Sequence, residues 1–306
     1  MAHSSINNGR LGLRCGRSAV SALAAGAFLC WSLSSCSESE SDSFSHTGEI
    51  PDMSTFIQIG GCGLAGLNWQ GDGMYFTSSM SGKSQVFRHM GKHQWPWQLT
   101  VFSDGIDGFT LSEDGKWGIV RASVGGSEQS QLYLMNMSNG AVDTLTDFEK
   151  TQTGSVIWAP DNESIFFRSN HETEGNFQVY RMDILAREIT PVFDQPEYDI
   201  PAGITRDGAG LFVYSFRSNA DNDLHLVDLQ TGESTKLNEG DGEFNYFNPT
   251  LMPDGKTVFM LSNNNTDGIT RIARMRLGNP SLEYVTDWID PKWTIDDLGF
   301  SRDFKY

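Results

Sequence analysis

Two arginines occupy the same position in two copies of a recurring sequence phrase. Arg121 and Arg168 each lie seven residues after an aspartate, Asp114 and Asp161 respectively. If the two copies fold alike and pack side by side, both guanidinium groups project toward the same region. Paired guanidinium groups bind carboxylates through bidentate, charge-assisted hydrogen bonds. The spacing makes these arginines a candidate site for a carboxylate ligand such as a peptide terminus. The alternative is that each arginine pairs with a local Asp or Glu.

The aspartates of the phrase indicate a structural turn rather than a catalytic carboxylate. They are Asp72, Asp114, Asp161, Asp207, Asp254 and Asp303, at spacings of 42, 47, 46, 47 and 49 residues. The residue that follows is Gly73, Gly115, Gly208 or Gly255 in four copies and Asn162 in a fifth. An Asp side chain accepts hydrogen bonds from nearby backbone amides, and Gly or Asn tolerates the positive φ of such turns. We therefore predict that these six side chains close hairpins.

Motifs for catalysis or metal binding are weak in this sequence. No serine has a glycine two residues away on both sides, so the nucleophile motif G-x-S-x-G is absent. The stretch "GCGLAG" at 61–66 matches G-x-G-x-x-G, but a strand pattern follows it where a dinucleotide site needs a helix. His89 and His93 are expected to flank a surface turn. Acidic pairs such as Asp221 and Asp223 are expected in solvated loops, with a calcium site as the alternative. We expect no cofactor and no metal.

Two tryptophans lie outside the recurring phrase. Trp95 and Trp97 flank a proline in the stretch "QWPWQLT". We assign both side chains to core packing, and the alternative is an exposed contact surface.

The N-terminal stretch indicates export from the cytoplasm. Three arginines precede the apolar run "AVSALAAGAFLCWSL", which is too short for a good membrane span. The run closes on "LSSC", which resembles the lipobox of bacterial lipoproteins. This resemblance implies a signal peptide over 1–36 and lipidation of Cys36, whereas an ordinary cleaved signal peptide is the alternative. The acidic, Ser-rich residues 37–53 are predicted to form a flexible tether. We therefore expect a lipid-anchored protein of the cell envelope, in the periplasm or at the cell surface.

The charge of the chain argues against nucleic acid as a partner. The formal net charge is −17, and without residues 1–36 the chain has 19 basic and 39 acidic residues, a net charge of −20. Such a chain repels phosphate backbones and anionic headgroups, so membrane contact is expected through the lipid anchor only. Cys62 is the one thiol left after processing, which excludes an internal disulfide and a Cys-based metal cluster.

The recurring phrase predicts an all-β fold. After each aspartate comes a strand such as "SIFFRS" or "LFVYSF", then a polar tip, an alternating strand such as "QVYRM", a turn and a short last strand such as "DTLT". Helical periodicity is not convincing anywhere. Four strands in a repeat of this length are typical of a β-propeller blade. A four-stranded sheet cannot bury both faces alone, so the blades must stack around an axis.

The repeat boundaries divide residues 54–306 into five complete four-stranded antiparallel blades and a partial sixth. We expect them at about 64–104, 105–150, 151–195, 198–240 and 243–288, with the partial blade at 293–306. Two arrangements of the chain ends stay open. Residues 54–61, "STFIQIGG", could complete the sixth blade and close the propeller, which removes exposed sheet edges. Otherwise the propeller is open and the chain is a truncated reading of a longer protein.

The first two repeats resemble a known family. The stretch "YFTSSMSGKSQVFRHMGKHQWPWQLT" resembles blades of the prolyl-oligopeptidase (S9) serine peptidases, and residues 105–136 are similar to the following blade. TolB-like propellers, with their WD40-like repeats, share the shorter core of the pattern. In S9 peptidases the propeller caps a C-terminal α/β-hydrolase domain and restricts access to small peptides. The present sequence departs from that pattern because it carries no G-x-S-x-G motif and no βαβ alternation, so no catalytic residue is assigned.

Two functional hypotheses follow. The chain is either a binding module, which holds a peptide, glycan or protein at the propeller mouth or rim, or the gating half of an S9-type dipeptidyl- or oligopeptidase whose catalytic domain is missing. Whether the protein acts in an enzyme stays open at this point.

Overall fold

The computed structural model describes residues 61–67, 73–91, 93–238, 242–286, 293–301 and 304. The chain divides into two compact units, 1–50 and 51–306, and every described residue belongs to the second. The lipidation candidate Cys36, the predicted tether, residues 54–60 and the turn residues Asp72 and Asp303 lie outside the described residues. Within the described part, no helix has the length and apolar character needed to cross a bilayer.

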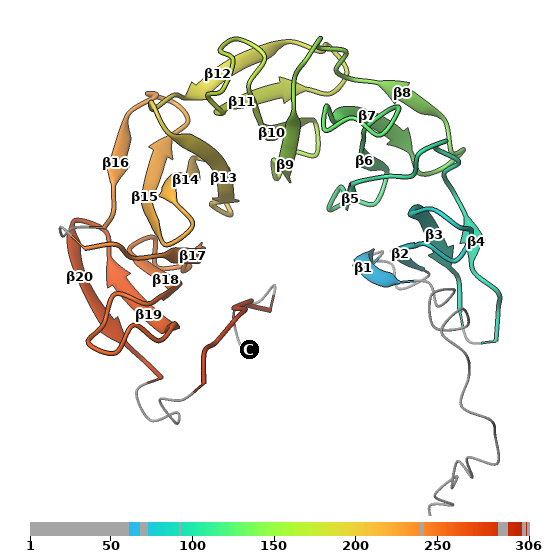
Figure 1. Ribbon diagram of the computed structural model, residues 1–306. Coiled ribbons are helices and arrows are strands. Elements are labelled where there is room, and N and C mark those ends of the chain that lie inside the picture. Colours follow the sequence, from blue (N-terminus) through green and yellow to red (C-terminus); the bar gives the residue numbers. More distant parts are fainter. Residues whose placement is uncertain are drawn as a thin grey trace, which may run out of the picture. The chain divides into compact units, whose positions relative to one another are not determined.

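Five four-stranded antiparallel sheets follow one another along the chain (Figure 1). Blade 1 consists of β1 (Cys62–Leu67), β2 (Met74–Ser78), β3 (Gln85–His89) and β4 (Trp97–Gln98). Blade 2 consists of β5 (Gly108–Leu111), β6 (Trp117–Ala122), β7 (Gln131–Asn136) and β8 (Val142–Thr144). Blade 3 consists of β9 (Thr153–Trp158), β10 (Ser164–Ser169), β11 (Gln178–Asp183) and β12 (Ile189–Phe193).

The last two sheets have the same construction. Blade 4 consists of β13 (Tyr198–Ile204), β14 (Gly210–Ser218), β15 (Asp221–Asp228) and β16 (Ser234–Lys236). Blade 5 consists of β17 (Tyr246–Leu251), β18 (Thr257–Ser262), β19 (Arg271–Arg276) and β20 (Asn279–Tyr284). Each strand pairs with its neighbours in sequence, so every blade is a four-stranded meander. The five complete blades predicted from the sequence are confirmed.

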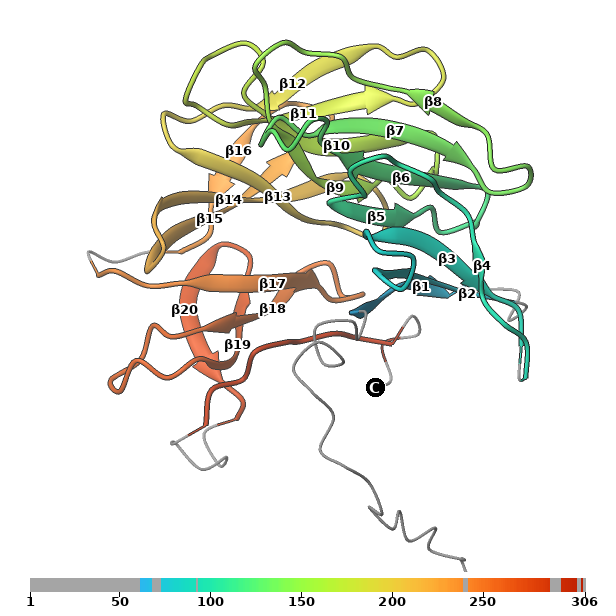
Figure 2. The ribbon, with the colours of Figure 1, turned by 45° about the vertical axis from the view of Figure 1, so that its right-hand side comes forward.

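The first strand of each blade lies toward a common centre, and the fourth lies on the outside (Figure 1). β1 contacts β5, β9 contacts β13, and β13 contacts β17, while β9 also contacts β6 and β7 of the preceding blade. Figure 2 shows β5, β9 and β13 side by side in a second view. Residues that belong to the inner strands of different blades are therefore neighbours in space.

Second strands of blades that have a neighbouring blade on both sides are buried on both faces, because they lie between adjacent blades. In β10, "SIFFRS", every side chain except that of Arg168 is buried. Alternate residues of such a strand contact different neighbouring blades: Phe167 packs with Ile119 of blade 2, whereas Phe166 packs with Leu211 of blade 4. Each large apolar side chain buried in this way stabilises the fold by roughly 1.5–3 kcal/mol. The interfaces between blades form the core.

The turn aspartates of the described residues accept hydrogen bonds from the residues that follow them. In blade 3, an Asp161 carboxylate oxygen accepts from the amides of Glu163 at 2.8 Å and Ser164 at 3.1 Å. Asp114, Asp207 and Asp254 likewise accept from the amide two residues on. Positive φ angles at the next residue permit the tight turn: they are found at Gly115, Asn162, Gly208 and Gly255.

A glutamine at the start of the third strand ties blade 1 to the segment that leads into blade 2. Gln85 donates from Nε2 to the carbonyl oxygen of Phe102 at 2.8 Å, and its Oε1 accepts from the amide of Phe102 at 3.1 Å and from the hydroxyl of Thr100 at 2.8 Å. Gln131 makes the same pair of backbone bonds to Phe148 in blade 2. We call this arrangement the glutamine clamp. It explains why "Q…LT" recurs in the sequence.

Two sequence expectations differ from the structure or are refined by it. Trp95 and Trp97 are 81% and 67% exposed, so their assignment to core packing was wrong. They lie on and beside β4, a two-residue strand at the outer edge of blade 1, and no further strand of the described residues pairs with it. The stretch "GCGLAG" contributes most of β1, which pairs with β2, so blade 1 begins at Cys62, slightly before the expected residue 64.

The described part of the C-terminal segment, residues 293–301, is not assigned to a strand. It packs on blade 5: the ring of Phe300 lies edge-on to that of Phe259 at 5.5 Å, and the side chain of Asn248 donates to Asp297 at 2.7 Å.

Candidate functional site

Arg121 and Arg168 come from adjacent blades and lie opposite glycines. In blade 2, Arg121 on β6 pairs in register with Gly108 on β5. In blade 3, Arg168 on β10 pairs with Gly154 on β9. Each arginine therefore faces an inner strand that carries no side chain at the paired position. The same position, seven residues after the turn aspartate, is Ser79 in blade 1, Tyr214 in blade 4 and Leu261 in blade 5, so the cationic pair is confined to blades 2 and 3.

Gly154 lies between the two guanidinium groups. A Cβ atom at this position would lie 3.0 Å from Nη1 of Arg121 and 3.3 Å from Nε of Arg168. The structure thus brings the two sequence-predicted arginines together. Burial, and then the positive charge of Arg121, lowers the pKa of Arg168 to about 10. An arginine pKa this low indicates that the cation is poorly stabilised where it lies.

Arg168 is held by aromatic rings instead of an acidic partner. Its guanidinium lies 4.9 Å from the ring centroid of Phe177 and 4.7 Å from that of Tyr198. Stacking on aromatic faces contributes about 0.5–2 kcal/mol per cation. Its Nε is buried and has no hydrogen-bond acceptor. Among the described residues no carboxylate forms an ion pair with either arginine, although Arg121 donates to the carbonyl oxygen of Asp107 at 3.0 Å. We call Arg121 and Arg168 the twin-arginine site.

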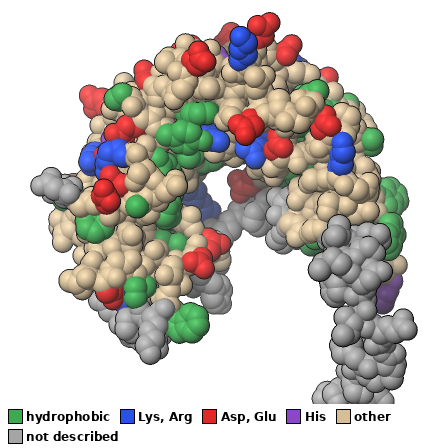
Figure 3. Space-filling model, in the orientation of Figure 1, with side chains coloured by type: hydrophobic (Ala, Val, Ile, Leu, Met, Phe, Trp, Pro, Cys, Tyr) green, Lys and Arg blue, Asp and Glu red, His purple; other side chains and the backbone are tan. Residues whose placement is uncertain are grey.

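A pocket of about 270 Å³ adjoins the twin-arginine site between blades 2 and 3. Its wall includes Arg121 itself, and its lining is Gly108, Phe109, Thr110, Ile119, Arg121, Ser155 and Val156. The lining combines three apolar side chains, two hydroxyls and one cation. Figure 3 shows Lys and Arg side chains at the edge of the hollow on the face that it presents.

Ser155, next to Gly154, has a φ of 48°, in the left-handed region. It occupies a β-bulge where the register of β9 against β10 shifts. Asn248 of β17 also has a positive φ, 51°, at the corresponding bulge of blade 5. Because the same bulge occurs in two blades, it is a feature of the repeated blade structure and is not specific to the twin-arginine site. In blade 3 its effect is to place a hydroxyl-bearing residue at the twin-arginine pocket.

The acidic pair considered for calcium is engaged in ion pairs. Arg217 donates to both carboxylate oxygens of Asp221, at 2.6 and 2.7 Å, and also binds Asp223. Lys236 binds Asp223 at 2.8 Å. Neither aspartate lies in a loop, since both belong to β15. No group of three or more potential metal ligands occurs among the described residues.

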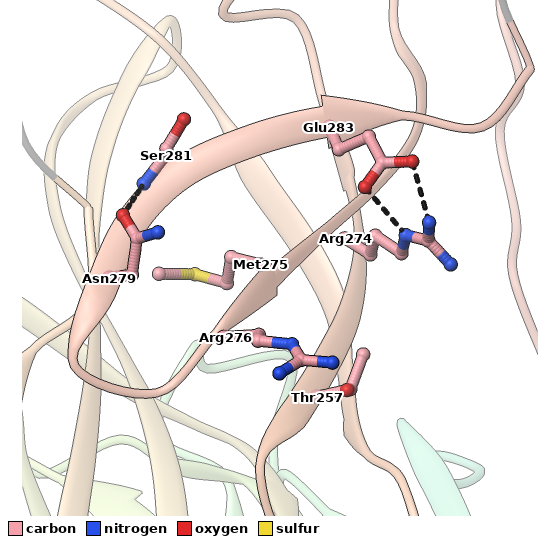
Figure 4. A pocket seen from close by; sticks show the side chains of 7 residues that line it. All are labelled: Thr257, Arg274, Met275, Arg276, Asn279, Ser281 and Glu283. Carbon is pink, nitrogen blue, oxygen red and sulfur yellow. Dashed lines mark hydrogen bonds and ion pairs between the residues drawn. The ribbon is translucent and has the colours of Figure 1, made fainter.

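A second surface pocket lies on blade 5 and has a different character. Figure 4 shows its lining, from β18, β19 and β20, with a volume of about 310 Å³. Here Arg274 donates to both oxygens of Glu283, at 3.0 and 2.6 Å. The charge of Arg274 is thus matched by a carboxylate, and the charge of Arg276 interacts with the carboxylate of Asp254. This contrast favours the twin-arginine site as the place where the protein meets an anion.

Sequence reasoning found the two arginines but missed the residues that shape their surroundings. Phe177 and Tyr198 lie nine residues after Arg168 and at the start of the next blade, so no spacing rule within one repeat joins them to it. Gly108 and Gly154 carry a recognisable signal, because each lies six or seven residues before a turn aspartate in the same two repeats that contain the arginines.

Comparisons with known proteins agree with the fold. The family model described as PD40, TolB beta propeller domain, matches residues 110–275. This chain belongs to that family. The PD40 match covers the turn aspartates of blades 2 to 5 and both members of the twin-arginine site.

Individual relatives are distant. The chain is 27% identical over 215 residues to the Tol-Pal system protein TolB of Francisella tularensis, which covers 66% of this PD40 chain and 46% of that relative. It therefore spans about half the length of the curated relative that it matches. Among solved structures it is similar to a putative TolB from Agrobacterium tumefaciens, with a TM-score of 0.54, 17% identity and coverage of 73% and 79%. It is also similar to a prolyl endopeptidase, with a TM-score of 0.60, 14% identity and coverage of 74% and 36%.

Proposed function

We propose that this protein is an extracytoplasmic, lipid-anchored β-propeller that binds a peptide or protein partner through a carboxylate at the twin-arginine site. The observation that carries the proposal is the pair of guanidinium groups on either side of Gly154, with no carboxylate paired to them among the described residues. Acidic residues outnumber basic ones in this chain, whose net charge is −17, so an arginine without a carboxylate partner is unusual here. Two adjacent cations without one repel each other, and an anionic ligand would relieve that repulsion.

A binding role also agrees with the kind of fold. Propellers position loops and inner-strand residues around a centre, and unrelated functions are built on them, so the role must be argued from the site. The relative from Francisella tularensis is named as a protein of a Tol-Pal system. By analogy, we propose that the partner of this chain is another protein of the cell envelope.

The envelope location rests on the N-terminal sequence. The apolar run followed by "LSSC" supports lipidation of Cys36, and residues 37–53 would then hold the propeller away from the membrane. Membrane fractionation of the full chain tests this point. We expect the protein in the membrane fraction with a fatty acid attached, and Cys36→Ala should release it. A protein that carries no lipid would contradict the anchor.

Fluorescence anisotropy with an acidic probe tests the binding site. The probe is an N-terminally fluorescein-labelled peptide, Gly-Glu-Gly-Asp-Gly-Leu, with a free C-terminus. We expect Arg121→Gln and Arg168→Gln each to weaken binding about tenfold or more, because each removes one charge-assisted contact. Arg276→Gln on blade 5 makes the same change of charge far from the site and should leave affinity unchanged. If both site variants bind as tightly as the unsubstituted protein, the proposal fails.

One observation favours a second candidate, the gating propeller of an S9-type serine peptidase. The chain is similar in fold to a prolyl endopeptidase but covers only 36% of it, which leaves room in that protein for a domain with no counterpart here. Hydrolysis of oligopeptides by the complete gene product, together with a G-x-S-x-G motif in it, would support this candidate. A complete product without that motif would exclude it.

A further inference from the structure

We infer that the twin-arginine site captures the C-terminal carboxylate of a peptide whose last side chain is apolar and enters the adjoining pocket between blades 2 and 3. This inference rests on the proposed function, and it adds the identity of the group that is recognised. It requires that the arginine cations and an apolar cavity lie close enough for a single peptide residue to reach both, with its carboxylate on the cations and its side chain in the cavity.

The pocket meets that requirement because Arg121 is part of its wall. Phe109, Ile119 and Val156 give it apolar surface, and Ile119 is buried. A terminal residue carries its carboxylate and its side chain on the same Cα atom. With the carboxylate against the guanidinium of Arg121, the side chain lies directly beside this apolar lining. Small-molecule sites commonly combine such a mostly apolar cavity with a few placed polar groups.

The hydroxyls of the lining serve the rest of the terminal residue. Thr110 and Ser155 are the two hydroxyl-bearing members of the pocket wall. A peptide end presents one amide N–H and one carbonyl oxygen near the carboxylate, and a hydroxyl can either donate or accept a hydrogen bond. Capture of a C-terminal carboxylate is one of the recurring modes of peptide recognition.

The carboxylate of an internal Asp or Glu fits the same place less well. An internal Asp or Glu has peptide backbone on both sides, and the backbone amides on either side of it would have to pass through a cavity whose walls are mostly apolar. A buried amide without a hydrogen-bond partner is costly. The rings of Phe177 and Tyr198 stack on the guanidinium of Arg168, so a chain that continues past this cation would have to pass around them. An inorganic anion such as phosphate would leave the apolar cavity unfilled.

Four fluorescein-labelled pentapeptides test the inference with the full chain. They are Gly-Ser-Gly-Ser-Leu as the free acid, the same peptide as the C-terminal amide, Gly-Ser-Gly-Ser-Ser as the free acid, and Gly-Asp-Gly-Asp-Gly as the amide. We expect the leucine acid to bind about tenfold more tightly than its amide and several-fold more tightly than the serine acid. Arg121→Gln should remove the difference between acid and amide.

A variant of the pocket separates the cavity from the charges. Val156→Thr keeps the shape of the side chain and replaces one methyl group with a hydroxyl, so the fold should be retained. We expect it to reduce the preference for leucine over serine while the preference for acid over amide stays.

The outcomes distinguish this inference from the proposed function. If the leucine amide binds as well as the acid, C-terminal capture is wrong. If the amide with two internal aspartates is then the tightest ligand and depends on Arg121, the proposed function stands without the inference. Failure of all four peptides to bind, at concentrations up to the millimolar range, overturns both.

Discussion

Arg168 of blade 3 lies over the ring of Tyr198 of blade 4, with 4.7 Å between the guanidinium carbon and the ring centroid. The contact crosses the boundary between two sheets. Tyr198 is the first residue of β13, and its backbone bridges to Phe177, whose ring contacts the same guanidinium. The orientation of this cation is therefore set by the way in which blades 3 and 4 pack.

Replacement of Tyr198 tests whether the ring positions the cation. We expect Tyr198→Leu to weaken binding of the acidic hexapeptide several-fold, because Arg168 loses one of its two aromatic supports. Tyr198→Phe keeps the ring and should bind like the unsubstituted protein. Anisotropy titration measures both. Equal loss in the two variants would show that the hydroxyl, and not the aromatic face, is what matters.

Gly154 offers a test that changes no charge. In Gly154→Ala the added methyl group meets Nη1 of Arg121 and Nε of Arg168 at 3.0–3.3 Å, so one or both guanidinium groups must shift. We expect the affinity for the acidic hexapeptide to fall about tenfold, with only a small change in melting temperature since flexible side chains can move. The matched control is Gly61→Ala, next to β1 of blade 1, where an added Cβ meets no atom within 4 Å and the twin-arginine pocket is untouched. Full affinity in Gly154→Ala would count against a shared binding geometry.

The turn aspartates should contribute to stability and not to binding. Asp161→Ala removes the acceptor for the amides of Glu163 and Ser164 and for the Ser164 hydroxyl. We expect a loss of about 1–2 kcal/mol in the free energy of unfolding, seen as a melting temperature lower by several degrees. Asp161→Asn keeps one acceptor oxygen and should lose less. An unchanged melting curve for Asp161→Ala would refute the structural role of this residue.

Asp199 should make stability depend on pH. Its side chain is fully buried, bonds with the hydroxyl of Ser215 and accepts from the amide of Gln195 at 2.9 Å. Burial raises the pKa of Asp199 to about 7, although the hydrogen bonds from Ser215 and Gln195 oppose the rise. The folded state therefore holds a proton that the unfolded chain releases at pH values above about 4. Stability from this group is fully present below that pH and is lost as pH rises to about 7.

The substitution Asp199→Asn mimics the protonated form and tests this dependence. At pH 8 we expect the variant to be more stable than the unsubstituted protein, by on the order of 2 kcal/mol. The gain should shrink as pH falls from 7 to 4. Chemical denaturation at several pH values measures it. A variant that is less stable than the unsubstituted protein at pH 8 would contradict a raised pKa for Asp199.

The sequence predicted the parts of the fold that repeat within one blade. Strand alternation, the turn aspartates and the equivalence of Arg121 with Arg168 all follow from local patterns, because each copy faces the same local geometry. Contacts between blades were not predictable in the same way. Tyr198 contacts Arg168 only because blades 3 and 4 pack together, and the sequence periodicity of a single repeat does not predict this contact.

The two tryptophans also show that the sequence does not reveal how strands are placed within a sheet. The sequence predicts core packing for Trp95 and Trp97, because their aromatic character does not reveal which strand ends a sheet. β4 is the outermost strand of blade 1, and within the described part of the chain its two side chains are exposed.

The glutamine clamp affects how the protein unfolds. Since Gln85 and Gln131 each fasten a sheet to the stretch of backbone that starts the following one, melting of one unit detaches the beginning of its neighbour. Adjacent blades are thus expected to unfold cooperatively and not one at a time. Limited proteolysis should then convert the intact molecule to small fragments with few stable intermediates of one or two units.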